Sequence, residues 1–174
     1  QQASDVYHQV AELKSNGADY AILQQGYAQG LLHHYAEKAT VLTSLIEQYP
    51  RSDYADDAMY EIARAQLQQN KNEDAIHTYQ QLLKQYPNSN QAPKSSLELG
   101  MTYRTTKQYD QAILSFKSTI EHYPGTEEAY AALEGLEQVY VETNKIDEYI
   151  AYTKTLNRMK MQSSTSEDSL VYVT

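Results

Sequence analysis

The chain has 174 residues and a net charge of −9, from 14 lysines and arginines against 23 aspartates and glutamates. This acidity disfavours nucleic-acid binding, which needs lysine and arginine to neutralise phosphates, and no apolar run is long enough to cross a bilayer. The absence of cysteine excludes disulfides, thiolate catalysis and the common zinc motifs. With 41% hydrophobic residues, the chain is too apolar for a disordered acidic tail.

The first 14 residues have the apolar spacing of one amphipathic helix. Ala3, Tyr7, Val10 and Leu13 follow one another at intervals of three or four residues. We interpret residues 1–14 as the remnant of a repeat whose first helix precedes them. The chain is therefore expected to be a segment of a longer array.

A period of 37 residues governs the rest of the chain. Pro50, Pro87 and Pro124 each follow a tyrosine and each precede, by two residues, a serine or a threonine. Counting back by one period predicts a further unit without the Tyr-Pro mark. The four expected units are residues 15–50, 51–87, 88–124 and 125–161.

Each unit is predicted to be a helix, a tight turn and a second helix. In the second unit Met59, Ile62 and Ala63 share one helix face, and Ile76, Tyr79 and Leu83 share another. Short polar stretches at 69–71 and 106–108 separate the two helices. Because proline disfavours helical geometry at the residue before it, the second helix should end at the tyrosine. Ser52, Ser89 and Thr126 should then cap and open the next helix.

Gly100, Tyr103, Ala112, Phe116 and Pro124 resemble the signature of the tetratricopeptide repeat, whose unit has about 34 residues. The resemblance implies an all-α, right-handed α-solenoid in which the small residues Gly100 and Ala112 face each other where the paired helices cross. The first unit departs from the signature with Lys38 at a small position, and the fourth departs with Glu137 and Tyr149. The three extra residues of the period are expected to lengthen the first helix of each unit by about one turn.

The Tyr-Pro-x-Ser connections resemble those of bacterial envelope lipoproteins, namely the outer-membrane assembly and Tol–Pal coordinator families. The whole stretch is similar to long repeat proteins of Bacteroidetes-type bacteria. This resemblance implies a periplasmic or outer-membrane-associated location and an array that continues past both ends. For residues 162–174 two interpretations stay open, disorder or a linker followed by the start of another repeat at the capping pattern of Thr165 and Asp168.

The family resemblance also implies that the first helix of each unit lines a concave, protein-binding face. The partner-binding residues carried over to this sequence are Tyr20, Leu23, Tyr27, Leu31, Tyr60, Arg64, Lys94, Met101 and Arg104. Arginine binds carboxylates in bidentate fashion, so the basic middle of this surface favours a carboxylate or an acidic peptide. Tyrosine, leucine and methionine at helical spacing are also typical of a core.

Two alternatives to a protein- or peptide-binding scaffold remain. One is a structural spacer without its own ligand. The other is a glycan-binding module using tyrosine platforms, which the lack of tryptophan disfavours. No enzyme, cofactor or metal site is expected, because His33 and His34 fall in a predicted turn and no catalytic or metal-binding spacing occurs. The sequence leaves the oligomeric state and the partner's identity open.

Overall fold

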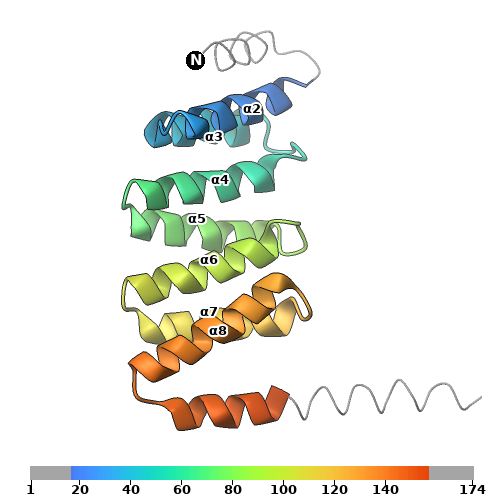
Figure 1. Ribbon diagram of the computed structural model, residues 1–174. Helices are drawn as coiled ribbons and strands as arrows, with labels where there is room; N and C mark the ends of the chain where they lie inside the picture. Colours follow the sequence, from blue (N-terminus) through green and yellow to red (C-terminus); the bar gives the residue numbers. More distant parts are fainter. Residues whose placement is uncertain (1–16, 157–174) are drawn as a thin grey trace, which may run out of the picture.

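The computed structural model describes residues 17–156, and over this range it consists of helices joined by short turns (Figure 1). The helices lie crosswise to the long axis of a stack that begins with α2. Their bounds are α2 Ala18–Leu31, α3 Tyr35–Gln48, α4 Ala55–Gln68, α5 Asn72–Gln85, α6 Ala92–Thr105, α7 Tyr109–His122 and α8 Glu127–Glu142. Residues 146–156 form a further helix at the other end.

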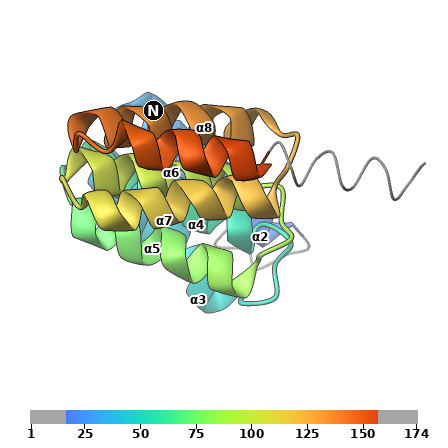
Figure 2. The same cartoon turned by 90° about the horizontal axis from the view of Figure 1, so that it is seen from below.

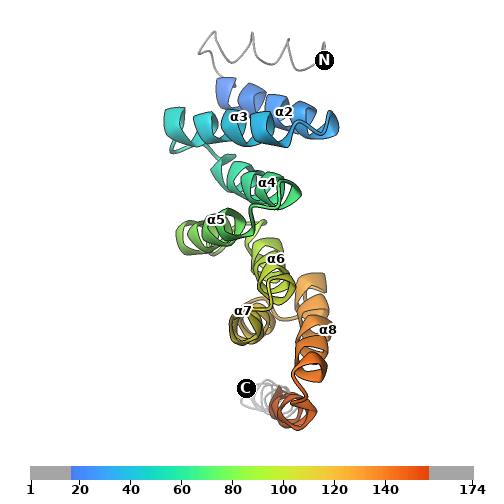
Figure 3. The same cartoon turned by 90° about the vertical axis from the view of Figure 1, so that its left-hand side faces the viewer.

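The helices form antiparallel pairs that stack into a solenoid, which confirms the expected fold class. The side view shows α4, α6 and α8 on one side of the stack and α5 and α7 on the other (Figure 3). From below, α5, α6, α7 and α8 run roughly alongside one another (Figure 2). We call the exposed side formed by α2, α4, α6 and α8 the A-helix face. Each helical pair falls inside one expected unit, whereas residues 1–14 and 162–174 lie outside the described residues.

The turn inside each pair repeats one backbone geometry. His33, Asn70, Lys107 and Asn144, spaced by 37 residues, all have φ between 57° and 60°. At each turn the residue after the left-handed one donates its backbone N–H to the carbonyl five residues before it, as the Lys71 N–H does to Gln66 O at 2.9 Å. This is the Schellman motif, in which a left-handed residue ends a helix. The polar turns predicted at 69–71 and 106–108 are therefore present.

The Tyr-Pro connections differ from the expectation in two of three cases. Helices α4 and α6 begin at Ala55 and Ala92, three residues after Ser52 and Ser89. The extra residues form a turn instead of a helical extension, in which the Ala55 N–H donates to Ser52 O at 3.2 Å and the Ala92 N–H donates to Ser89 O at 3.1 Å. In the first connection the Tyr54 N–H also donates to Ser52 Oγ at 3.2 Å. Only α8 begins as predicted, with Thr126 Oγ1 accepting from the Ala129 N–H at 3.1 Å.

We call the contact between the second helix of one pair and the first helix of the next a joint. The first joint is α3–α4, the second α5–α6 and the third α7–α8. One buried cluster spans α2, α3 and α4, and a second runs from α4 to α8. The core is thus continuous along the stack, as a repeat array requires, since no pair can bury its apolar face alone.

Phe116, the one phenylalanine of the chain, is held between two glycines at the third joint. A Cβ atom added to Gly100 would lie 2.7 Å from the Phe116 ring, and so would one added to Gly135. Gly100 therefore faces Phe116, one turn along α7 from the expected Ala112. Gly135 of α8 provides a close approach to Phe116 of the preceding pair, while Glu137 is exposed. Helix α8 packs against both α6 and α7.

Candidate binding surface

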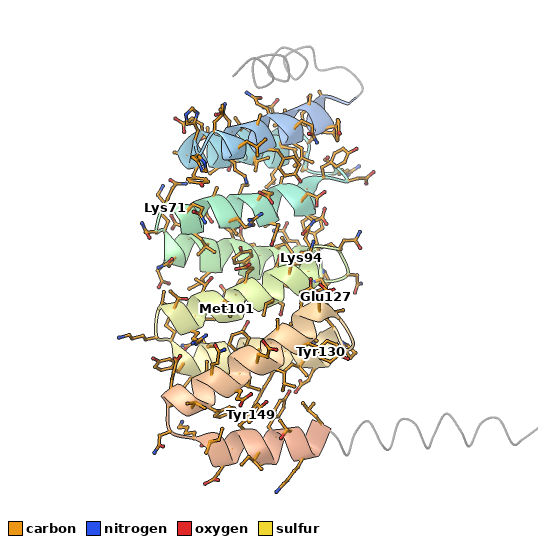
Figure 4. The ribbon with its side chains drawn as sticks, viewed as in Figure 1. Lys71, Lys94, Met101, Glu127, Tyr130 and Tyr149 are labelled. Carbon is orange, nitrogen blue, oxygen red and sulfur yellow. The ribbon has the colours of Figure 1, made fainter. Side chains whose placement is uncertain are left out.

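The residues expected to contact a partner come from α2, α4 and α6. Tyr20, Leu31 and Met101 are exposed by 47%, 84% and 40%, respectively. Lys94 is also exposed and lies near the start of α6, and Met101 lies nearer its end (Figure 4). Leu23 is different, because it is only 3% exposed and belongs to the core cluster of α2, α3 and α4. Leu23 is therefore a core residue and offers no surface to a partner.

A cavity of about 480 Å³ opens at the first joint and gathers three of the expected residues. Tyr27 and Leu31 line it from α2, and Arg64 lines it from α4. The other lining residues are Gly30, Tyr35, Lys38, Glu61, Ala65 and Gln68. The cavity thus combines aromatic and aliphatic side chains with a charged floor.

The floor of this cavity is an ion pair buried between α3 and α4. Lys38 is 7% exposed and Glu61 is 8% exposed, and the Lys38 ammonium donates a short hydrogen bond to the Glu61 carboxylate. Gly30 leaves room for the Lys38 side chain, since a Cβ atom at residue 30 would lie 3.2 Å from the Lys38 Cδ and Nζ atoms. A buried charge is tolerated only when it is paired, so each of these side chains requires the other.

Arg64 adds a second cation to the same carboxylate. Its Nη1 atom donates to Glu61 Oε1 at 3.1 Å, and its guanidinium lies 5.7 Å from the centre of the Tyr60 ring. The Arg64 side chain is nevertheless 54% exposed. Two cations therefore share one carboxylate at the floor and rim of the cavity, which leaves a positive charge accessible from solvent.

The tyrosines beside the cavity stay protonated. Burial, together with the nearby carboxylates of Asp57 and Glu61, raises the pKa of Tyr27 to about 12. Burial also raises the pKa of Tyr60, an effect that Arg64 partly offsets. Near neutral pH both hydroxyls are therefore hydrogen-bond donors as well as acceptors.

Arg104 lies apart from this cavity and is held by α8. Its Nη2 atom is 2.6 Å from Glu142 Oε1, and its Nη1 atom donates to Gln138. Arg104 therefore joins α6 to α8, whereas Arg64 lies on α4 at the first joint. The two arginines do not converge on one point. The positive charges expected in the middle of the surface lie instead at two separate sites, Arg64 beside Glu61 on α4 and Arg104 beside Glu142 on α8.

Sequence reasoning missed Lys38 and Glu61 as parts of this surface. The sequence does carry a signal for them, since Lys38 stands where the second unit has Ala75 and the third has Ala112. A charged residue at a small, buried position needs a partner from the neighbouring helix. Glu61 is that partner, 23 residues later.

The described residues offer neither a metal site nor a membrane-spanning helix. Within residues 17–156 no three histidine, aspartate or glutamate side chains gather closely enough to hold a metal ion. No helix in that range is both long and apolar enough to span a bilayer.

Solved structures with the same fold are numerous, although their sequences are distant. A crystal structure of MamA is 17% identical, with a TM-score of 0.71, over 93% of this chain and 89% of that chain. MamA from Desulfovibrio magneticus RS-1 is 13% identical, with a TM-score of 0.62, over 93% of this chain and 97% of that chain. A putative kinesin light chain from Podospora anserina with nearly identical TPR-like repeats is 13% identical, with a TM-score of 0.68, over 95% and 88% of the two chains. At such identities the likeness concerns the fold alone.

No curated protein matches the sequence significantly. The tetratricopeptide repeat family, in contrast, matches at residues 20–52, 57–89 and 94–126, more than half of the chain. These three segments cover nearly all of the helical pairs from α2 to α7, and the family match does not extend to the fourth pair, which the 37-residue period predicts. Proteins of this family are in general non-enzymatic scaffolds, and no catalytic family is indicated. The chain belongs to the tetratricopeptide repeat family.

Proposed function

We propose that the chain is a non-enzymatic module that binds a protein or peptide segment through its A-helix face. The observation that carries the proposal is the cavity at the first joint, where Tyr27 and Leu31 stand beside the exposed guanidinium of Arg64. An aromatic and aliphatic wall with one accessible positive charge suits an apolar residue next to an acidic one. We therefore expect an acidic segment to bind at this joint.

A binding screen with a charge-neutral counterpart tests this proposal. Fluorescein-labelled acidic peptides would be compared, by anisotropy, with peptides in which asparagine and glutamine replace aspartate and glutamate. A hydrogen bond to a charged group contributes about 1.5–3 kcal/mol, so Arg64→Gln should weaken binding roughly tenfold or more. Lys84→Gln is the matched control, because Lys84 is exposed on α5, away from the cavity.

The screen also separates this proposal from the spacer alternative. Equal binding by wild-type protein and Arg64→Gln, with both folded by circular dichroism, would remove Arg64 from the site. Absence of binding by any peptide would favour a spacer. The spacer alternative has its own support between α6 and α8, where the Arg104 guanidinium is already bound by Gln138 and Glu142 of the same chain.

A location in the bacterial envelope is a further part of the proposal. It rests on the likeness of the Tyr-Pro-x-Ser connections at Tyr49 and Tyr86 to envelope repeat proteins. Fractionation of the native host, followed by immunoblotting of cytoplasmic, periplasmic and outer-membrane fractions, tests it directly. Recovery in the cytoplasmic fraction would contradict it.

A further inference from the structure

The helix formed by residues 146–156 is more exposed than the second helices of the other pairs. Each of α3, α5 and α7 packs against the first helix of the next pair, whereas no helix follows residues 146–156 in the described part of the stack (Figure 1). Ile150 is 43% exposed, although its equivalent two periods earlier, Ile76, is 6% exposed. Thr153 is also partly exposed, whereas its equivalents are fully buried at all three joints. The face that a second helix uses at a joint is therefore open here.

The 37-residue period assigns the first helix of a further pair to the sequence that follows. Ser166 and Ser169 stand where α4, α6 and α8 bury an alanine or a serine, and Val173 stands where they bury an isoleucine or a leucine. Thr165 stands at the N-cap position of α4 and α6, and threonine is a preferred N-cap residue. The segment 166–174, outside the described residues, thus has the start signal and the buried positions of a helix that packs at a joint.

The residues at the centre of such a joint are also complementary in size. At the third joint the large Phe116 of the second helix packs against Gly135 of the next helix. One period later the same two positions hold Thr153 and Tyr172, so the large residue changes sides. Cores tolerate such an exchange when the volume is kept, and a tyrosine ring over Thr153 would replace the phenylalanine ring under Gly135.

Tyr149, a large residue on the same helix, does not fill this space. It takes the place of Lys38, which at the first joint reaches the next helix. Tyr149 lies instead against α8, with its ring 6.3 Å from the Tyr140 ring and its hydroxyl 3.5 Å from the Glu137 carboxylate (Figure 4). The surface around Thr153 is therefore left for another helix.

We propose that residues 166–174 form the first helix of a fifth pair and dock on the helix of residues 146–156, with the Tyr172 ring over Thr153. Docking buries Ile150 and the apolar side chains of the segment, and burial between neighbouring units is what stabilises a repeat array. The occupant of the open face is thus the chain's own next segment.

The connection that this docking requires has a described equivalent. Residues 160–165 correspond, three periods later, to residues 49–54, which join α3 to α4. A docked helix extends the A-helix face by one helix, because Val171 takes the place of Glu134 on α8. The inference concerns a different surface from the cavity at the first joint and goes beyond the proposed function.

Aspartate variants of two nearby valines test the docking in the whole chain. Val173 faces the helix of residues 146–156, whereas Val171 takes the place of the exposed Glu134 and is the matched control. By hydrogen exchange and mass spectrometry, the amides of residues 166–174 should exchange roughly tenfold or more faster in Val173→Asp than in the wild type. Val171→Asp should exchange like the wild type. Equal exchange in the two variants, or wild-type amides as fast as those of an unstructured peptide, would overturn the proposal.

NMR spectra report the contact itself and identify the chain that provides the docked helix. A nuclear Overhauser cross-peak is expected between the Tyr172 ring and the Thr153 methyl group, with an intensity that does not change on dilution. Absence of this cross-peak would overturn the proposal, and its loss on dilution would do so as well, because a second copy would then cover the face. Neither measurement uses an acidic peptide, so failure here is distinct from failure of the Arg64 site.

Discussion

Gly135→Ala is expected to destabilise the protein even though alanine is the better helix former. A Cβ atom at residue 135 would lie 2.7, 2.9 and 3.1 Å from three atoms of the Phe116 ring. Ordinary carbon–carbon contacts are about 3.5–4.0 Å, so the ring must move by several tenths of an ångström. It has nowhere to move, because its other side already meets Gly100, where an added Cβ would be equally close.

Two opposing effects set the size of the change. Replacing glycine by alanine inside a helix stabilises by about 1 kcal/mol. Overpacking a filled core costs about 1–3 kcal/mol. We therefore expect a net loss of about 0–2 kcal/mol in the free energy of unfolding. In a Phe116→Leu background the smaller side chain relieves the overlap, and Gly135→Ala should then stabilise by up to about 1 kcal/mol.

Urea unfolding of the four variants of this double-mutant cycle gives the coupling directly, with an expected value of about 1–3 kcal/mol. Glu134→Ala compared with Glu134→Gly provides the helix-propensity control, because Glu134 is exposed on the same helix. If Gly135→Ala stabilised the wild-type protein as much as alanine stabilises position 134 over glycine, the contact between Gly135 and the ring would be refuted.

Three further predictions concern single positions. Lys107 has a φ of 60°, a conformation that costs a non-glycine residue about 1 kcal/mol. Lys107→Gly should therefore raise the free energy of unfolding in urea by up to about 1 kcal/mol, whereas Lys107→Ala should not raise it. Thr126→Ala removes the cap of α8 and should cost about 1 kcal/mol, whereas Ser89→Ala, whose hydroxyl has no partner among the described residues, should cost clearly less; equal losses would contradict this. Because burial raises the pKa of Glu98 above 4.5, its folded state favours the protonated carboxyl, and Glu98→Gln should stabilise the protein at pH 7. That gain should shrink as the pH falls through the raised pKa and vanish below pH 4.5, and a gain independent of pH would contradict the assignment.

The repeat period predicted the architecture because it is imposed by packing that every unit shares. Tyr-Pro pairs, polar turns and apolar faces recur at one spacing, and they yield paired helices whatever the neighbouring units contain. The starts of α4 and α6 were mispredicted for a local reason. Ser52 can cap a helix or close a turn, and its hydrogen bond from the Tyr54 N–H shows that it does the latter.

The binding surface was only partly predictable, because it depends on contacts between units. A family position places Arg64 and Arg104 on one face, but it does not reveal that Glu142 reaches back from α8 to take Arg104. Leu23 was assigned to the surface by the same rule, although it packs into the first core cluster. Conversely, Lys38 was treated as a defect in the signature, and only the neighbouring helix shows its partner Glu61.

The first and third joints differ in the side chains that they bury, an ion pair at the first and a glycine against a phenylalanine ring at the third, and this difference affects which helices can pair during folding. Helices of nearly equal length and shape can mispair with a unit further along the chain, which is a known failure of repeat proteins. If α3 docked on α8, Lys38 would meet Gly135 in place of Glu61 and would be buried without a counter-charge. Such a charge costs several kcal/mol. The ion pair that interrupts the family pattern thereby disfavours docking of α3 on α8.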